Sequence, residues 1–104
     1  MVTCMCVVQG EQAPDRRQEE MKTLLQGFSD RAFGEAAQIA WLPVPPGNGF
    51  TAGKPSSSSV VAFTANQPLG AEQRETLLRE LASLWTEETG CSLDEIVAVI
   101  SDPT

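Results

Sequence analysis

Hydrophobic and polar residues alternate along this chain with two different periods, and the changes of period predict its first elements. Apolar and β-branched residues fill positions 2–8, which predicts a strand. Pro14 and Asp15 suit the first turn of a helix, and Gly34 suits its end. A second short strand is predicted at 39–42. The helix between them carries apolar residues at the i, i+3, i+4, i+7 and i+11 spacing of an amphipathic helix, namely Met21, Leu24, Leu25, Phe28 and Ala32.

The same order of elements returns in the second half of the chain. Positions 60–65 predict a strand, 71–89 a helix closed by Gly90, and 96–100 a final strand. Between the helix and that strand, 92–95 has the pattern of a capping box and predicts one short turn. The apolar stripe of this second helix consists of Leu77, Leu78, Leu81, Leu84 and Trp85.

The two halves are copies of one another. Residues 2–46 recur in altered form 57 positions later, and a long period present twice indicates a duplicated supersecondary unit. We therefore expect one domain, 1–104, made of a first unit 1–46, a Gly/Ser/Pro-rich connector 47–58 and a second unit 59–104. Matching residues at this offset include the pairs Arg17/Arg74, Leu24/Leu81 and Ile39/Ile96.

Each unit has the order strand, helix, strand, which makes its two strands parallel through a right-handed crossover. Two such units side by side predict an α+β fold with a four-stranded mixed sheet and both helices on one face. The strand at 96–100 is apolar at every position, so its second face also needs a cover. Self-association of the chain provides that cover most simply.

Composition excludes several classes of function. The chain has 41% hydrophobic residues and a net charge of −7, which argues against nucleic-acid binding because that requires a basic surface. No apolar run approaches the roughly 20 residues of a membrane span, and no signal peptide opens the sequence. We expect a cytoplasmic protein with neither a nucleic-acid nor a membrane partner.

The cysteines do not have the pattern of a metal centre. Cys4, Cys6 and Cys91 are accompanied by no histidine, whereas a structural zinc site usually needs four Cys or His ligands. Without histidine, Ser–His and Cys–His nucleophiles are also excluded. We expect no metal and no cofactor, with the first two cysteines packed in the core as small apolar side chains.

Two stretches in the second unit resemble the tautomerase superfamily. GAEQRETLLREL at 70–81 and CSLDEIVAVISD at 91–102 resemble the helix and second strand of 4-oxalocrotonate tautomerase. The connector GNGFTAGKPSSSS at 47–59 resembles the family's Phe/Gly-rich segment, and the two-copy length is similar to macrophage migration inhibitory factor. The resemblance implies a homotrimer in which three sheets form a barrel wrapped by helices.

The resemblance also implies proton transfer on small keto or enol acids. In the family an N-terminal proline is the base, because a secondary amine in an apolar pocket can accept a proton at neutral pH. Here Val2 stands at the proline position behind Met1, so a free amine on either residue is the remaining candidate base, although Val2 also fits an ordinary residue of a core strand. The family's substrate-holding arginines are replaced by uncharged residues in both copies, at Gln12 and Leu69 and near Ala40 and Val97.

Four further residues are candidates for substrate binding. Phe50 matches the aromatic residue that walls the family's pocket, and Trp41 is either a second wall or part of the core. Lys54 and Arg31 are the cations placed to meet an anionic group at the pocket mouth, although Lys54 also fits a solvated loop lysine.

The sequence therefore leaves two functions open. One is an atypical keto–enol proton transfer on a small keto or enol acid without the usual proline base. The other is a non-catalytic trimer that binds a small-molecule ligand or a partner. A hetero-oligomer with a proline-bearing paralogue is a third arrangement that the sequence does not separate from a homotrimer.

Overall fold

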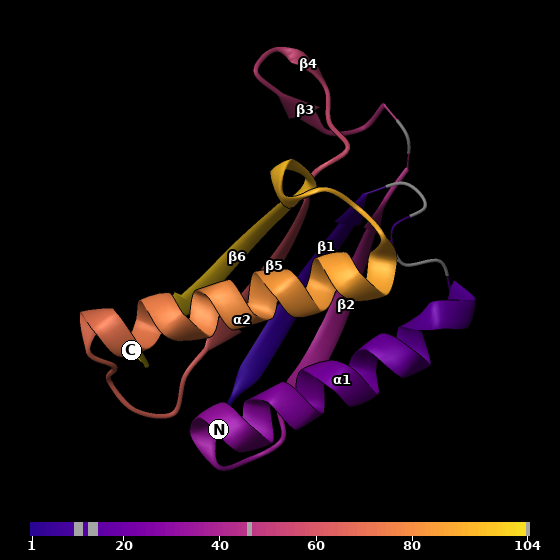
Figure 1. Ribbon diagram of the computed structural model, residues 1–104. Coiled ribbons are helices and arrows are strands. Elements are labelled where there is room, and N and C mark those ends of the chain that lie inside the picture. Colours follow the sequence, from indigo (N-terminus) through magenta and orange to yellow (C-terminus); the bar gives the residue numbers. More distant parts are fainter. Residues whose placement is uncertain (10–11, 13–14, 46, 104) are drawn as a thin grey trace.

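Four strands form one mixed sheet in the order β2-β1-β5-β6 in the computed structural model, which describes residues 1–9, 12, 15–45 and 47–103 (Figure 1). The strands β1 and β2 are parallel, as are β5 and β6, and the antiparallel pair β1/β5 joins the two units. The predicted duplicated β-α-β architecture is confirmed. The strands are β1 (Thr3–Gln9), β2 (Gln38–Val44), β5 (Ser59–Thr64) and β6 (Ile96–Ser101).

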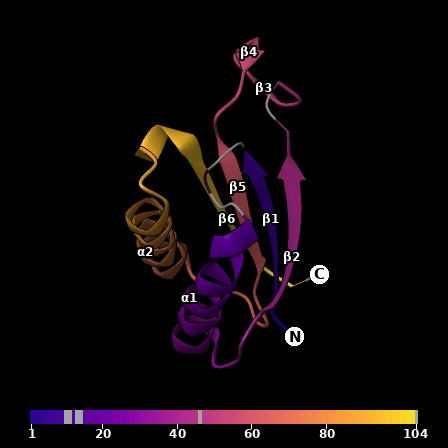
Figure 2. The ribbon, with the colours of Figure 1, turned by 90° about the vertical axis from the view of Figure 1, so that its right-hand side faces the viewer.

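Both helices, α1 (Asp15–Phe33) and α2 (Ala71–Thr89), cover the same face of the sheet (Figure 2). They run antiparallel, and two ion pairs connect them: Arg17 with Glu88 at 3.2 Å and Arg31 with Glu80 at 3.3 Å. The helix α1 ends before Gly34, which has the left-handed φ of 80° that glycine tolerates best. Pro14, predicted in the first turn, lies outside the described residues.

The core fills the space between the helices and the sheet. Three phenylalanine rings, Phe28, Phe33 and Phe63, contact one another there with centroids 5.3 to 6.1 Å apart. The stripe predicted for the first helix is wrong at Leu24, which is 37% exposed, whereas Leu25 is fully buried. The buried Leu25 lies three residues before the buried Phe28, whereas the buried Leu81 lies four residues before the buried Trp85, so the leucine that faces the sheet in α1 is one position out of step with the 57-residue repeat. One residue turns a helix by about 100°, which places Leu25 toward the sheet.

The face of the sheet away from the helices is apolar and uncovered, as the sequence predicts. Met5 on β1, Leu42 on β2 and Val97 on β6 are 46%, 54% and 49% exposed. In the strand register Met5 lies between Ala40 and Ala62, so these apolar side chains are neighbours across the strands. The patch is continuous across all four strands.

The connector between the units contains a small hairpin that is not predicted from the sequence pattern. Its strands β3 (Phe50–Thr51) and β4 (Lys54–Pro55) are joined by Ala52 and Gly53, which both have positive φ. The hairpin projects beyond the end of the sheet, and the N-terminus lies at the opposite end (Figure 1).

Candidate functional site at the N-terminus

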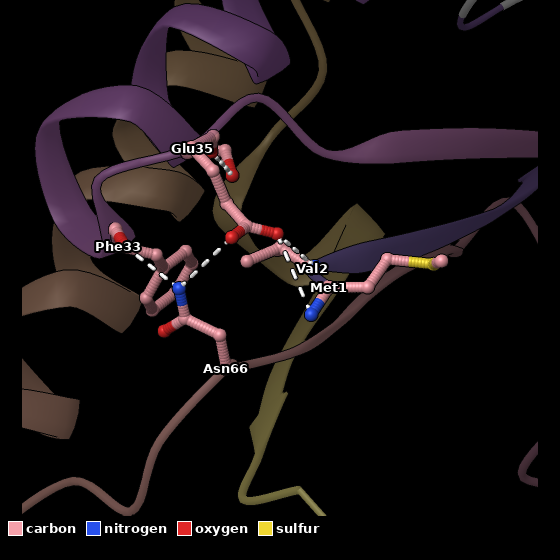
Figure 3. A network of polar contacts seen from close by, with 6 residues as sticks. Met1, Val2, Phe33, Glu35 and Asn66 are labelled. Carbon is pink, nitrogen blue, oxygen red and sulfur yellow. Dashed lines mark hydrogen bonds and ion pairs between the residues drawn. The ribbon is translucent and has the colours of Figure 1, made fainter.

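The N-terminal amine lies beside the carboxylate of Glu35. The Met1 nitrogen is 3.6 Å from Glu35 Oε1, and the backbone N–H of Val2 donates to the same oxygen at 2.7 Å (Figure 3). The Val2 side chain is completely buried in the core. Position 2 is therefore fixed from two sides, by its apolar side chain and by its backbone hydrogen bond.

Glu35 reaches this position because the loop between α1 and β2 is short and well bonded. The Gly34 N–H donates to Asp30 O at 3.0 Å and ends the helix, and the Ser29 hydroxyl donates to Glu35 O at 2.6 Å. The Gln38 N–H then donates to Val2 O at 3.0 Å, which starts the pairing of β2 with β1. This loop therefore holds Glu35 next to the first residues of the chain.

Asn66 joins the cluster from the other unit, just after β5. Its Nδ2 donates to Phe33 O at 2.9 Å and to Glu35 Oε2 at 3.4 Å (Figure 3). Its Oδ1 is buried and has no hydrogen-bond partner among the described residues. Buried polar atoms normally find a partner, so this oxygen is an exception among the described residues.

The contacts around Glu35 stabilise its ionised form. The hydrogen bond from the Val2 N–H is the main reason that the pKa of Glu35 lies below its usual value. The Asn66 amide and, to a smaller extent, the N-terminal ammonium lower this pKa further, while desolvation raises it. At neutral pH the side chain is a carboxylate, so it can orient a cation.

The residues predicted for substrate binding occupy three separate places. Phe50, 67% exposed, and Lys54 lie together on the hairpin. The strand β1 has seven residues and spans roughly 20 Å, so this hairpin and the N-terminal amine of one chain lie about that far apart. Trp41 is half-buried beside Cys6 on the helix-covered face, and Arg31 pairs with Glu80 on the helix layer. The structure brings Met1 and Val2 together with Glu35, and does not bring the other four residues to them.

Sequence reasoning missed Glu35 and Asn66, although topology offers a signal for the first. Parallel strands start at the same edge of a sheet, so the residue just before β2 must lie near the residue just before β1. Glu35 is the carboxylate in that loop. Asn66 could be located only with the antiparallel pairing of β1 and β5, which the sequence pattern does not reveal.

Within the part of the chain that the structure describes, no three Cys, Asp or Glu side chains are grouped so that they could hold a metal ion. The described helices also include none with the length and apolar character needed to cross a membrane. The groups that meet at the N-terminal cluster are an amine, a carboxylate and a carboxamide.

Comparisons with known proteins identify the fold. No protein-family profile matches the sequence, and no curated protein is similar to it. The structure of native Ps01740 superimposes with a TM-score of 0.86 at 16% identity, over 97% of this chain and 93% of that one. Pt0534 inactivated by 2-oxo-3-pentynoate gives 0.81 at 15% identity over 97% and 85% of the two chains. The Q0 fused 4-OT symmetric trimer gives 0.82 at 11% identity, also over 97% and 85%. The chain has the tautomerase fold. The resemblance in the sequence is confirmed at this level, which by itself assigns no reaction.

Proposed function

We propose that this chain is a tautomerase-superfamily protein in which an N-terminal amine, held by Glu35, transfers a proton on a small keto or enol acid. The observation that carries the proposal is the 2.7 Å hydrogen bond from Val2 N to Glu35 Oε1, beside the Met1 amine. The inactivation of Pt0534 by 2-oxo-3-pentynoate supports the substrate class, because that compound is a small 2-keto acid.

The reaction needs a group that accepts a proton at one atom of the substrate and returns it at another. The free amine accepts the enol hydroxyl proton, and the resulting ammonium delivers a proton to the neighbouring carbon. Glu35 orients the amine and stabilises its charged form through the cycle. Asn66 Nδ2 donates to Glu35 Oε2 and so helps to hold that carboxylate beside the amine.

Removal of Met1 improves this site. The Val2 nitrogen then becomes the free amine, already 2.7 Å from Glu35 Oε1, and the buried Val2 side chain holds it in place. The Met1 amine, at 3.6 Å and with an exposed side chain, is less well fixed. We therefore propose the form that begins with Val2 as the more active one, with Met1 as the base in the unprocessed chain.

The complete site needs more than one copy of the chain. Phe50 and Lys54 lie roughly 20 Å from the amine of their own chain, so they can meet an amine only from a neighbouring copy. The uncovered apolar sheet face supplies a surface for that neighbour. The Q0 fused 4-OT protein, which shares the fold, is a symmetric trimer. We propose a homotrimer in which Phe50 walls the pocket and Lys54 meets the substrate carboxylate.

The other two predicted contacts have smaller parts in this proposal. Arg31 already pairs with Glu80, so it would reach a substrate only by leaving that carboxylate. Trp41 packs against the core and would support the pocket from behind.

The cysteines are unpaired thiols, which is typical of a reducing compartment, and we propose that the protein acts in the cytoplasm.

A second candidate function is a trimer that binds a ligand or a partner without catalysis. One observation favours it: Gln12, at the place of a family arginine, is bonded to the Trp85 indole and to backbone carbonyls instead of facing an anion. An ammonium held permanently by Glu35 would also be a poor base.

An electrophile separates the two functions. The Cys91→Ser variant, which removes the partly exposed thiol, is incubated with 2-oxo-3-pentynoate and analysed by peptide mass spectrometry. A reactive amine adds to the alkyne, so catalysis predicts a covalent adduct on the N-terminal residue and protection by excess phenylpyruvate. Complete recovery of the unmodified N-terminal peptide would favour the non-catalytic trimer. The same spectra show whether Met1 has been removed.

A further inference from the structure

A cavity lies at the end of the sheet opposite the N-terminal cluster. Its volume is about 440 Å³, within the range of small-molecule sites. It opens between the connector, the C-terminal end of α2 and the short helix η1 (Leu93–Glu95). Its walls include Gln9, Gln12, Ser56, Ser57, Cys91 and Glu95.

Gln12 makes one wall of this cavity rigid. Its Oε1 accepts a hydrogen bond from the Trp85 Nε1–H at 2.9 Å, and its Nε2 donates to Glu95 O at 3.0 Å. The same Nε2 also donates to Ser57 O. One carboxamide therefore joins α2, the connector and the segment before β6, and it keeps the cavity walls in a fixed arrangement.

Gln9 supplies an unused acceptor on another wall. The residue is only 7% exposed, and its backbone N–H donates to Ser59 Oγ at 3.0 Å. Its side-chain Oε1 is buried without a hydrogen-bond partner among the described residues. The connector also approaches closely at Gly49, where an added Cβ would clash with Gln9 Nε2. The carboxamide is therefore confined and lacks only a donor for its oxygen.

The charges around the cavity indicate which kinds of hydrogen-bond-donating ligand it would accept. The described residues that line it include no lysine or arginine. Glu95 accepts the Ser92 N–H at 2.9 Å, and this hydrogen bond is the main reason that the pKa of Glu95 lies below its usual value. The lining is therefore rich in acceptors and carries a negative charge at neutral pH. Such a site favours neutral or cationic donors and disfavours carboxylates.

We propose that this cavity is a second binding site, for a small molecule that donates an ammonium or amide N–H to Gln9 Oε1 and carries no carboxylate. The proposed site uses none of the residues at the N-terminal cluster, although Pro55 in the cavity wall pairs with Phe50 of the proposed catalytic pocket. It also selects a charge type opposite to that of a keto acid.

Three probes of nearly the same shape test the ligand class: 2-phenylethylamine, phenylacetamide and phenylacetate. Each is titrated into the ¹⁵N-labelled protein, and backbone amide shifts are followed by NMR. We expect the amine and the amide to shift resonances of Gln9, Ser57 and Cys91, and to bind at least tenfold more tightly than phenylacetate. Equal affinity for phenylacetate, shifts confined to other regions, or no binding by any probe would overturn the proposal.

Two variants test the assigned acceptor. Gln9→Met keeps the length of the side chain and removes the oxygen, so affinity for both donor probes should fall about tenfold. Gln73→Met makes the same change at an exposed position of α2 and should leave both affinities unchanged. Gln9→Glu retains an acceptor and adds charge, so it should bind 2-phenylethylamine more tightly than the wild type does. Unchanged binding in Gln9→Met, with a dispersed native spectrum, would show that Gln9 is not the contact.

Discussion

Gln9 and Asn66 stand 57 positions apart in the chain, and each buries a side-chain carbonyl oxygen without a partner among the described residues. Because β1 and β5 are antiparallel, each amide side chain lies beside the start of the other unit's first strand. Gln9 bonds to Ser59 through its backbone, and Asn66 contacts the carboxylate that holds Val2. The duplication thus produces two related edges, one with the terminal amine and one with a cavity.

Glu35→Gln should lower stability in a pH-dependent way. The pKa of Glu35 is lowered in the folded protein, so its stabilising effect is complete above its unfolded pKa of about 4.3 and is lost as the pH falls through the folded value. The variant should be less stable than the wild type at pH 7, and the difference should shrink toward pH 3. Urea denaturation at both pH values measures this.

The matched control for that variant is Glu20→Gln, at an exposed position of α1. It removes the same charge without touching the N-terminal cluster, so it should show no comparable pH-dependent loss. A Glu35→Gln protein as stable as the control at pH 7 would contradict the assigned role of Glu35 in holding the N-terminus.

Gln12→Leu should destabilise the protein by about 1 to 3 kcal/mol, because the buried indole N–H of Trp85 loses its acceptor. The backbone carbonyls of Ser57 and Glu95 lose their donor at the same time. Urea denaturation followed by tryptophan fluorescence gives the difference in unfolding free energy. Gln73→Leu, an exposed change on α2, should stay within about 0.5 kcal/mol of the wild type. Equal stability of the two variants would exclude the bridging role.

Leu25→Ala and Leu24→Ala form a pair that tests the orientation of α1. Leu25 is fully buried, so Leu25→Ala should lower the free energy of unfolding by about 2 to 5 kcal/mol, because a cavity opens against the sheet. Leu24 is 37% exposed in the groove between the helices, so Leu24→Ala should lower the free energy of unfolding clearly less. Thermal unfolding of both variants compares them. A larger loss of stability for Leu24→Ala than for Leu25→Ala would mean that Leu24, and not Leu25, faces the sheet, as the 57-residue repeat predicts.

Met5→Lys should break the proposed homotrimer, because it places a charge at the centre of the uncovered sheet face. Light scattering coupled to gel filtration should give about three times the subunit mass of 11.2 kDa for the wild type and close to one subunit for the variant. Gln73→Lys adds the same charge on α2 and should leave the trimer intact. A wild-type mass of one subunit would remove the proposed route by which Phe50 reaches the amine.

The long elements of this fold are predictable because their apolar periods extend over many residues. The helix at 71–89 is predicted at its observed bounds, and the strand at 96–100 falls within one residue of β6. The hairpin at 50–55 is not predictable, since two strands of two residues carry no period. Its positive φ values occur at Ala52 as well as Gly53, and only the glycine is visible as a turn signal.

The candidate site is less predictable than the fold because it depends on contacts between distant parts of the chain. The importance of position 2 could be read from the sequence, but Glu35 is 33 residues away and Asn66 belongs to the other unit. Where Phe50 and Lys54 lie relative to the amine depends on a neighbouring copy, which no single chain contains. The residues of the site were therefore only partly found by matching motifs.

The central claim is that the N-terminal amine transfers the proton, and blocking that amine tests it most directly. The ketonisation of phenylpyruvate enol is followed by its ultraviolet absorbance with the wild type and with the same protein acetylated at its N-terminus. The account predicts a rate above background for the wild type and a loss of at least tenfold on acetylation. No acceleration by the wild type, or equal rates for the two proteins, would contradict it.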